Sequence, residues 1–228
     1  MRYLLACIVV ILLAFNTSSV LARDMNTMPE VTGGQVNEAL NNLTPVRFFP
    51  NNPLYFLIRG KEIITRFFQP SFRERAQFDY TISSKRLKEA YLLTSRGDTG
   101  KTRSELSSYI ATLGRIEGQL EKARSQNQDV TVIVDKIADN LIYQEVLLSS
   151  LSNLGDQDRE LFGDKLEEGL NSFGDFVLYL DKIKPGLRSR FKLFTKESVK
   201  QKSQNEIVVS PSPALEATGR AKPRRIIF

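Results

Sequence analysis

Apolar residues recur at alternating gaps of three and four along much of this chain, which is the spacing of a helix that packs against another helix. The first such series is Leu106, Tyr109, Leu113, Ile116, Leu120 and Ala123. The second, with one polar member, is Val130, Val134, Ile137, Leu141, Gln144, Leu148 and Leu151. The third is Phe162, Leu166, Leu170, Phe173, Val177 and Leu180. Because short polar breaks separate the series, we predict antiparallel neighbours in an all-α helical bundle.

A further helix precedes these three. It begins at Pro70 and ends at Gly97, a residue suited to the left-handed turn after a helix. Its apolar side consists of Phe72, Ala76, Tyr80, Ser83, Leu87, Ala90 and Tyr91. The residues expected to face water are Lys85, Arg86, Lys88 and Glu89. Asp98 or Thr99 can then cap the start of the next helix.

The segment from Pro53 to Phe68 differs from the others because its apolar residues run nearly all the way round a helix. They are Leu54, Tyr55, Phe56, Leu57, Ile58, Ile63, Ile64, Phe67 and Phe68. Asn52 can cap this helix, with Pro53 in its first turn. Such a helix is either deeply buried or lies on a membrane surface. We favour burial, because it would serve as a core for the four polar-faced helices that follow.

The remaining segments lack a sustained period and set the domain organisation. Residues 23–49 are rich in Asn, Thr and Gly and predict a flexible leader. Residues 200–228 contain three prolines among polar and basic residues and predict a disordered basic tail. Between them we expect one domain, residues 50–199, with about five helices and coiled-coil-like packing. The pattern also allows a short basic helix over 187–199.

The first 22 residues have the pattern of a secretory signal peptide. Arg2 precedes an apolar run of about a dozen residues, and small residues end at Ala22. Roughly 20 apolar residues are needed to span a bilayer. We therefore expect cleavage before Arg23 and an extracytoplasmic protein, secreted or associated with the cell envelope. If the segment is retained instead, it anchors the chain in the membrane.

Composition narrows the chemistry and the partners. The chain has no histidine, and its one cysteine, Cys7, lies in the signal segment, so the commonest general base, nucleophile and transition-metal ligands are missing from the mature protein. We expect no enzyme, no catalytic residues, no metal and no cofactor. The net charge is +6, but bases and acids are interleaved outside a cluster at 220–225. An exported chain rarely meets nucleic acid, so we expect no such partner.

Two loops partly match ligand-binding motifs. Residues 97–102 end like a phosphate-binding loop, but Ser95 stands where the leading glycine belongs and a helix precedes the loop. We interpret this loop as an interhelical turn. A partial calcium-loop pattern is formed by Asp156, Asp158, Glu160 and Glu167. Leu161 occupies the position where that loop requires glycine, so we interpret these acids as helix caps.

Several short stretches resemble a bacterial family labelled domain of unknown function 5667. They are Pro53-Leu54-Tyr55-Phe56-Leu57, Lys61-Glu62, Phe67-Phe68, Arg75-Ala76, Arg86-Leu87-Lys88-Glu89-Ala90 and Arg96-Gly97-Asp98. The resemblance covers about residues 50–155 and implies an exported helical domain without assigned activity, cofactor or catalytic residues. Family members often have a histidine in the fourth helix, whereas residues 142–145 contain none.

Together these patterns predict an exported, non-catalytic interaction or structural module. Its partner would be a protein or a cell-envelope component. The alternative is a peripheral protein that binds a membrane or the cell wall through the first helix and the basic tail, with an anionic membrane surface as its partner. The sequence does not specify the oligomeric state.

Overall fold

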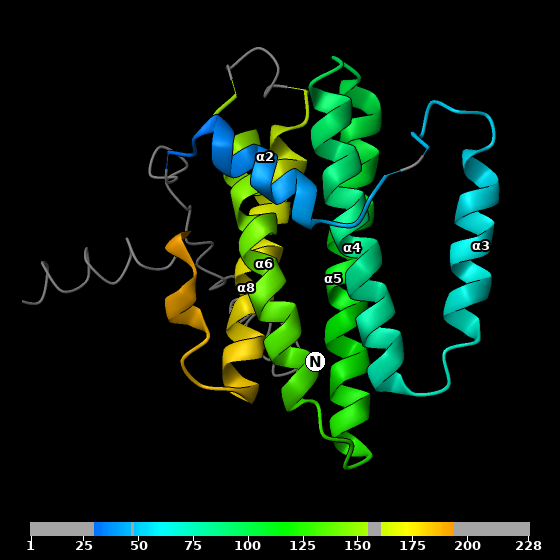
Figure 1. Ribbon diagram of the computed structural model, residues 1–228, viewed down its shortest axis with the longest axis vertical. Coiled ribbons are helices and arrows are strands. Elements are labelled where there is room, and N and C mark those ends of the chain that lie inside the picture. Colours follow the sequence, from blue (N-terminus) through cyan, green and yellow to red (C-terminus); the bar gives the residue numbers. More distant parts are fainter. Residues whose placement is uncertain (1–29, 47, 155–160, 194–228) are drawn as a thin grey trace, which may run out of the picture.

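The structure is a computed structural model that describes residues 30–46, 48–154 and 161–193. Its regular elements within these ranges are all helical, which confirms the all-α prediction (Figure 1). They are α2 (Gly33–Asn42), α3 (Tyr55–Phe67), α4 (Phe72–Thr94), α5 (Thr99–Ser125), α6 (Thr131–Ser152), α8 (Gly163–Ile183) and the short 3₁₀ helix η2 (Arg188–Arg190). The expected signal peptide, the start of the leader and the tail from 200 to 228 lie outside the described residues.

Four helices form the bundle, and α4 and α5 are its most extensively paired neighbours (Figure 1). The turn between them has Gly97 at a φ of 75°, which a residue with a Cβ adopts only with strain. Asp98 caps α5 by accepting a hydrogen bond from the Lys101 backbone N–H. The two helices therefore reverse direction over very few residues, as the turn pattern predicted.

The core is built by the three predicted apolar series. Every member of those series, Gln144 included, is at most 5% exposed. A buried Leu, Val or Phe side chain contributes about 1.5–3 kcal/mol through removal of its surface from water. These stripes on α5, α6 and α8 therefore stabilise the bundle, together with buried apolar residues of α4 such as Leu87 and Ala90.

Gln144 is a polar residue in this core with both ends of its amide bonded. Its Oε1 accepts from the Tyr109 hydroxyl at 3.0 Å, and its Nε2 donates to the Ser84 Oγ at 2.9 Å. One side chain of α6 is thereby tied to α5 and α4. Because an unpaired buried amide is costly, this network favours one relative alignment of the three helices.

The structure corrects the predicted leader, because residues 33–42 form α2. Thr32 and Gln35 make a reciprocal capping box at its start. Val36, Ala39 and Leu43 are buried, and α2 packs mainly against α6. The Asn and Gly content of this segment masks three apolar positions at helical spacing, which become stabilising only when α6 is present to cover them.

The ends of several helices also differ from the predictions. Ser71 rather than Pro70 precedes α4, where its side chain forms a capping box with Glu74. In the described part of the expected helix over 187–199, the chain forms the 3₁₀ turn η2 and is helical again at residues 192–193; the rest lies outside the described residues.

The largest correction concerns α3, the helix predicted to be a core element. It stands at the edge of the bundle beside α4 (Figure 1), and Tyr55 is its only buried residue. Most of its apolar side chains face away from the protein. The physical reason lies in the charged residues beneath it.

Candidate functional site

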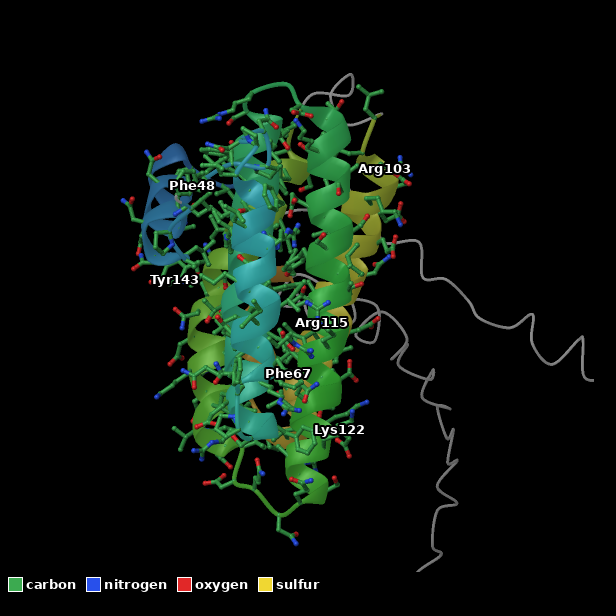
Figure 2. The ribbon with its side chains drawn as sticks, turned by 90° about the vertical axis from the view of Figure 1, so that its right-hand side faces the viewer. Phe48, Phe67, Arg103, Arg115, Lys122 and Tyr143 are labelled. Carbon is green, nitrogen blue, oxygen red and sulfur yellow. The ribbon has the colours of Figure 1, made fainter. Side chains whose placement is uncertain are left out.

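Helix α3 is an amphipathic helix that turns its polar side toward the bundle. Its polar stripe is Tyr55, Arg59, Glu62 and Arg66, spaced by four, three and four residues and therefore on one face. Its apolar outer face comprises Leu54, Phe56, Leu57, Ile63, Ile64, Phe67 and Phe68, which are 52–78% exposed. Figure 2 views the molecule from this side, with α3 in front and Phe67 toward its lower end.

The polar stripe of α3 meets charged residues of α4 and α5 in what we call the charged seam. The seam consists of Tyr55, Arg59, Glu62, Arg66, Asp79, Lys85, Arg86, Glu89, Glu105 and Arg115. Asp79, Arg86, Glu89 and Glu105 are buried. Directional ion pairs therefore hold α3 to the bundle, whereas the other helices are held by apolar packing.

Arg86 of α4 occupies the centre of the seam and is fully buried. One guanidinium nitrogen, NH1, donates to Glu89 at 2.6 Å and to the Tyr55 hydroxyl at 2.5 Å, and NH2 donates to Glu62. The Tyr55 hydroxyl in turn donates to Glu89 at 2.7 Å. A buried guanidinium is tolerated here because two carboxylates and a phenol surround it.

The two ends of α3 are fastened in the same way. Near its first turns, Arg59 makes two hydrogen bonds of 2.9 Å to Glu105 on α5. Near its last turn, Arg66 Nε donates to both oxygens of Asp79, at 2.8 and 3.0 Å. Between them Lys85 reaches Glu62 at 2.5 Å. The ion pairs thus run along the whole length of the helix.

The seam changes the protonation behaviour of its members. Burial raises the pKa of Glu105, and the Arg59 guanidinium opposes this shift. Burial likewise raises the pKa of Tyr55, with Glu105 and Glu89 adding to it. Burial lowers the pKa of Arg86, but Glu89, Glu62 and Tyr55 raise it, and the net shift is upward. Tyr55 is accordingly a neutral hydrogen-bond donor and Arg86 a permanent cation.

Three residues that we expected to face water therefore lie in the seam. Lys85, Arg86 and Glu89 are buried, and Lys88 alone of that set is partly exposed, with its Nζ bonded to the Leu40 carbonyl. The prediction was wrong because the pattern of α4 in isolation does not show that α3 covers its charged side. The four-three-four spacing of polar residues in α3 was the signal that could have revealed it.

The chemistry available in the seam is limited by this pairing. Its carboxylates are paired with guanidinium or ammonium groups. Within the described ranges, no group of three His, Cys, Asp or Glu side chains is placed to hold a metal ion. The acids Asp156, Asp158 and Glu160 of the calcium-like pattern lie outside those ranges. The segment 97–102 matches our interhelical interpretation, since it joins α4 to α5 and Asp98 caps the start of α5.

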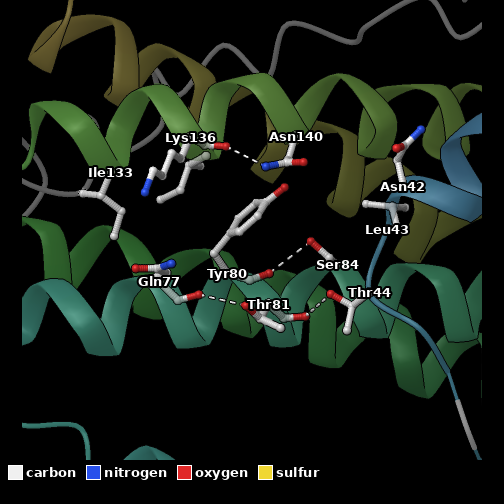
Figure 3. A pocket seen from close by; sticks show the side chains of 11 residues that line it. Asn42, Leu43, Thr44, Gln77, Tyr80, Thr81, Ser84, Ile133, Lys136 and Asn140 are labelled. Carbon is white, nitrogen blue, oxygen red and sulfur yellow. Dashed lines mark hydrogen bonds between the residues drawn. The ribbon is translucent and has the colours of Figure 1, made fainter.

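A separate hollow of about 270 Å³ lies between the end of α2, α4 and α6. Figure 3 shows Tyr80 between the two long helices, below Lys136 and Asn140. The Tyr80 hydroxyl is buried and makes no hydrogen bond to a described residue. Neighbouring side chains such as Asn140 are bonded to their own helix backbone. The hollow has room for water but lacks convergent charged groups.

None of the described helices combines the length and apolar character that crossing a bilayer requires. The chain matches no family model, no curated protein and no solved structure. The most distinctive feature of the described residues is therefore the inverted orientation of α3, with its polar side toward the bundle and its apolar side toward solvent.

Proposed function

We propose that this chain is a non-catalytic helical module of the cell envelope that binds a membrane surface through the outer face of α3. The observation that carries the proposal is the inverted orientation of that helix. Seven large apolar side chains project into solvent from one face, whereas monomeric proteins rarely expose contiguous apolar patches of such a kind without a binding role. An amphipathic helix lying in the plane of a bilayer buries a face of this composition.

The charged seam explains why α3 does not turn this face inward. Rotation of the helix would separate the buried groups Glu105, Asp79 and Arg86 from their α3 partners Arg59, Arg66 and Glu62, at a cost of several kcal/mol. Burial of a large apolar side chain returns about 1.5–3 kcal/mol. Insertion of the outer face into a membrane would provide this favourable free energy of burial and leave the ion pairs of the charged seam intact.

The size of α3 suits a surface-bound helix. Its 13 residues make a helix about 20 Å long, while a spanning helix needs about 20 residues. Phe67 and Phe68 pack edge to face at its end, with ring centroids 5.6 Å apart. The helix would therefore lie along the interface and insert these side chains into the acyl region.

Lys61 favours a membrane over a second copy of the chain. It is exposed and lies on the outer side of α3, one turn from both Leu57 and Ile64. A long lysine side chain can extend from a bilayer interface to the lipid headgroups. In a symmetric antiparallel pair of α3 helices, the two Lys61 ammonium groups would instead be buried against each other.

The proposal extends to the location of the protein. A signal segment that directs export, whether cleaved before Arg23 or kept as an anchor, brings the module to a membrane. Mass determination of the N-terminus of the protein purified from its host, together with fractionation, tests this part; we expect a chain beginning at Arg23. The resemblance to the domain of unknown function 5667 and a contribution from the basic tail stay predictions.

Vesicle flotation of the exported protein tests the binding itself. The variant F56S/I63S/F67S removes apolar surface from the outer face, and V132S/L161S/L178S removes exposed apolar side chains elsewhere. We expect wild type and the second variant to float with vesicles and the first to stay unbound. Failure of the wild type to bind vesicles would contradict the proposal. So would a concentration-dependent dimer abolished only by the first variant, which would identify a second copy as the occupant.

A further inference from the structure

Two arginines share one carboxylate at the C-terminal end of α3. Arg66 Nε lies 2.8 Å from Asp79 Oδ1, and Arg115 Nε of α5 lies 3.9 Å from the same oxygen. Asp79 is buried, while the side chains of Arg66 and Arg115 are 35% and 43% exposed. Both guanidinium groups thus extend from a buried acid toward the surface.

This arrangement leaves positive charge uncompensated at the surface. One carboxylate balances one guanidinium, and the shorter contact belongs to Arg66. Arg115 reaches Asp79 only as a distant ion pair, and it donates a hydrogen bond to a neutral group, the Thr112 hydroxyl, at 2.8 Å. The pKa of Arg115 is lowered by burial, opposed by Asp79, and lowered further by the neighbouring cations Arg66, Arg86 and Arg59. An anion at this position would relieve the repulsion.

The two arginines lie toward the C-terminal end of α3, the helix whose outer face is proposed to contact the membrane. Figure 2 shows Arg115 on α5 beside α3, just above the level of Phe67, with Lys122 lower on the same helix. Arg66 precedes Phe67 directly in the chain. With Phe67 in the acyl region, the two guanidinium groups beside it would lie near the phosphate layer.

We infer that Arg66 and Arg115 form a binding site for the phosphate of an anionic phospholipid, occupied while the outer face of α3 rests on the bilayer. The inference rests on the proposed membrane function and adds its lipid class. Guanidinium groups bind phosphate oxygens through paired N–H donors, and Arg115 has donors that Asp79 does not use. Asp79 holds both arginines in place from below.

The test compares flotation with vesicles of phosphatidylcholine alone and with vesicles that contain phosphatidylglycerol. The variant is Arg115→Gln, and the matched control is Arg103→Gln, which removes the same charge from α5 at a residue paired with Asp164 at 2.5 Å. Figure 2 places Arg103 at the opposite end of α5 from Lys122. We expect R115Q to reduce the preference for anionic vesicles roughly fivefold, the effect of one basic residue near such a surface, and R103Q to change it much less.

The outcomes separate this inference from the proposed function. Wild type that binds neutral and anionic vesicles equally overturns the lipid site and leaves membrane binding through α3 intact. Equal effects of R115Q and R103Q also overturn it, because the preference would then reflect overall charge. A wild-type chain that binds no vesicles contradicts both. If inorganic phosphate binds at Arg115 and anionic vesicles do not displace it, the site binds free phosphate and the lipid inference is overturned. Thermal unfolding of each variant verifies that it is folded.

Discussion

The guanidinium of Arg59 on α3 donates two hydrogen bonds, each 2.9 Å long, to the carboxylate of Glu105 on α5. The Glu105 side chain is 4% exposed and that of Arg59 is 34% exposed. A cation at the rim therefore compensates an acid in the interior. Removal of Arg59 would leave Glu105 desolvated without this partner, so the pair links the attachment of α3 to the stability of the bundle.

Substitution of Arg59 should consequently loosen α3. We expect Arg59→Met to lower the free energy of unfolding by about 1.5–3 kcal/mol, the range for hydrogen bonds to charged groups. Lys61→Met is the control, because Lys61 is exposed and makes no ion pair with a described residue; its effect should stay within about 0.5 kcal/mol. Urea denaturation measures both, and hydrogen exchange should accelerate in α3 before it does in α4. Equal effects of the two substitutions would contradict this role for Arg59.

Glu105 should also make stability depend on pH. Its pKa is raised in the folded protein above the ordinary value of 4.5 by burial, against the opposing effect of Arg59. Between the ordinary and the raised pKa the folded state binds more protons than the unfolded state, so this group stabilises the fold more as pH falls through that window. Glu105→Gln lacks the titration. The difference in unfolding free energy, wild type minus variant, should therefore rise from pH 7 toward 4.5, and a fall in that difference would show that the pKa is lowered instead.

The orientation of α3 can be measured by thiol labelling, since Cys7 is the only cysteine of the chain. In a Cys7→Ser background, Ile63→Cys should react with a maleimide nearly as fast as a free peptide. Ala90→Cys, at a buried position of α4, should react more slowly by a factor of roughly a hundred or more. Its thiol becomes accessible to the reagent only when the bundle opens locally. Slow labelling at position 63 would indicate that α3 buries its apolar face after all.

Two buried tyrosines should respond differently to loss of their hydroxyl groups. Tyr109→Phe leaves the buried Gln144 Oε1 without its donor and should cost about 1–3 kcal/mol. The Tyr80 hydroxyl has no hydrogen-bond partner among the described residues, so Tyr80→Phe should be neutral or slightly stabilising. Denaturation curves of the two variants distinguish these cases. A large loss for Tyr80→Phe would mean that its hydroxyl is bonded to water in the hollow.

The sequence alone determined the bundle. The apolar stripes of α5, α6 and α8 and the turn at Gly97 follow from local rules, because helical spacing places each stripe on one face and that face is stable only when it is buried. The secretory pattern at the N-terminus and the lack of histidine likewise require no structure to recognise. They narrow the location and the chemistry that we expect.

Only the tertiary structure decided which way α3 faces. The apolar residues that surround almost the whole of α3 favoured its burial, but that prediction considered only the apolar surface of the helix. It omitted the charges of α4 and α5, whose desolvation requires partners that the stripe with Arg59, Glu62 and Arg66 supplies. These charges are far apart in the sequence and meet only when the helices pack. Ion pairing between them turns the polar side of α3 inward, and the exposed outer face, from which the proposed function follows, is the consequence.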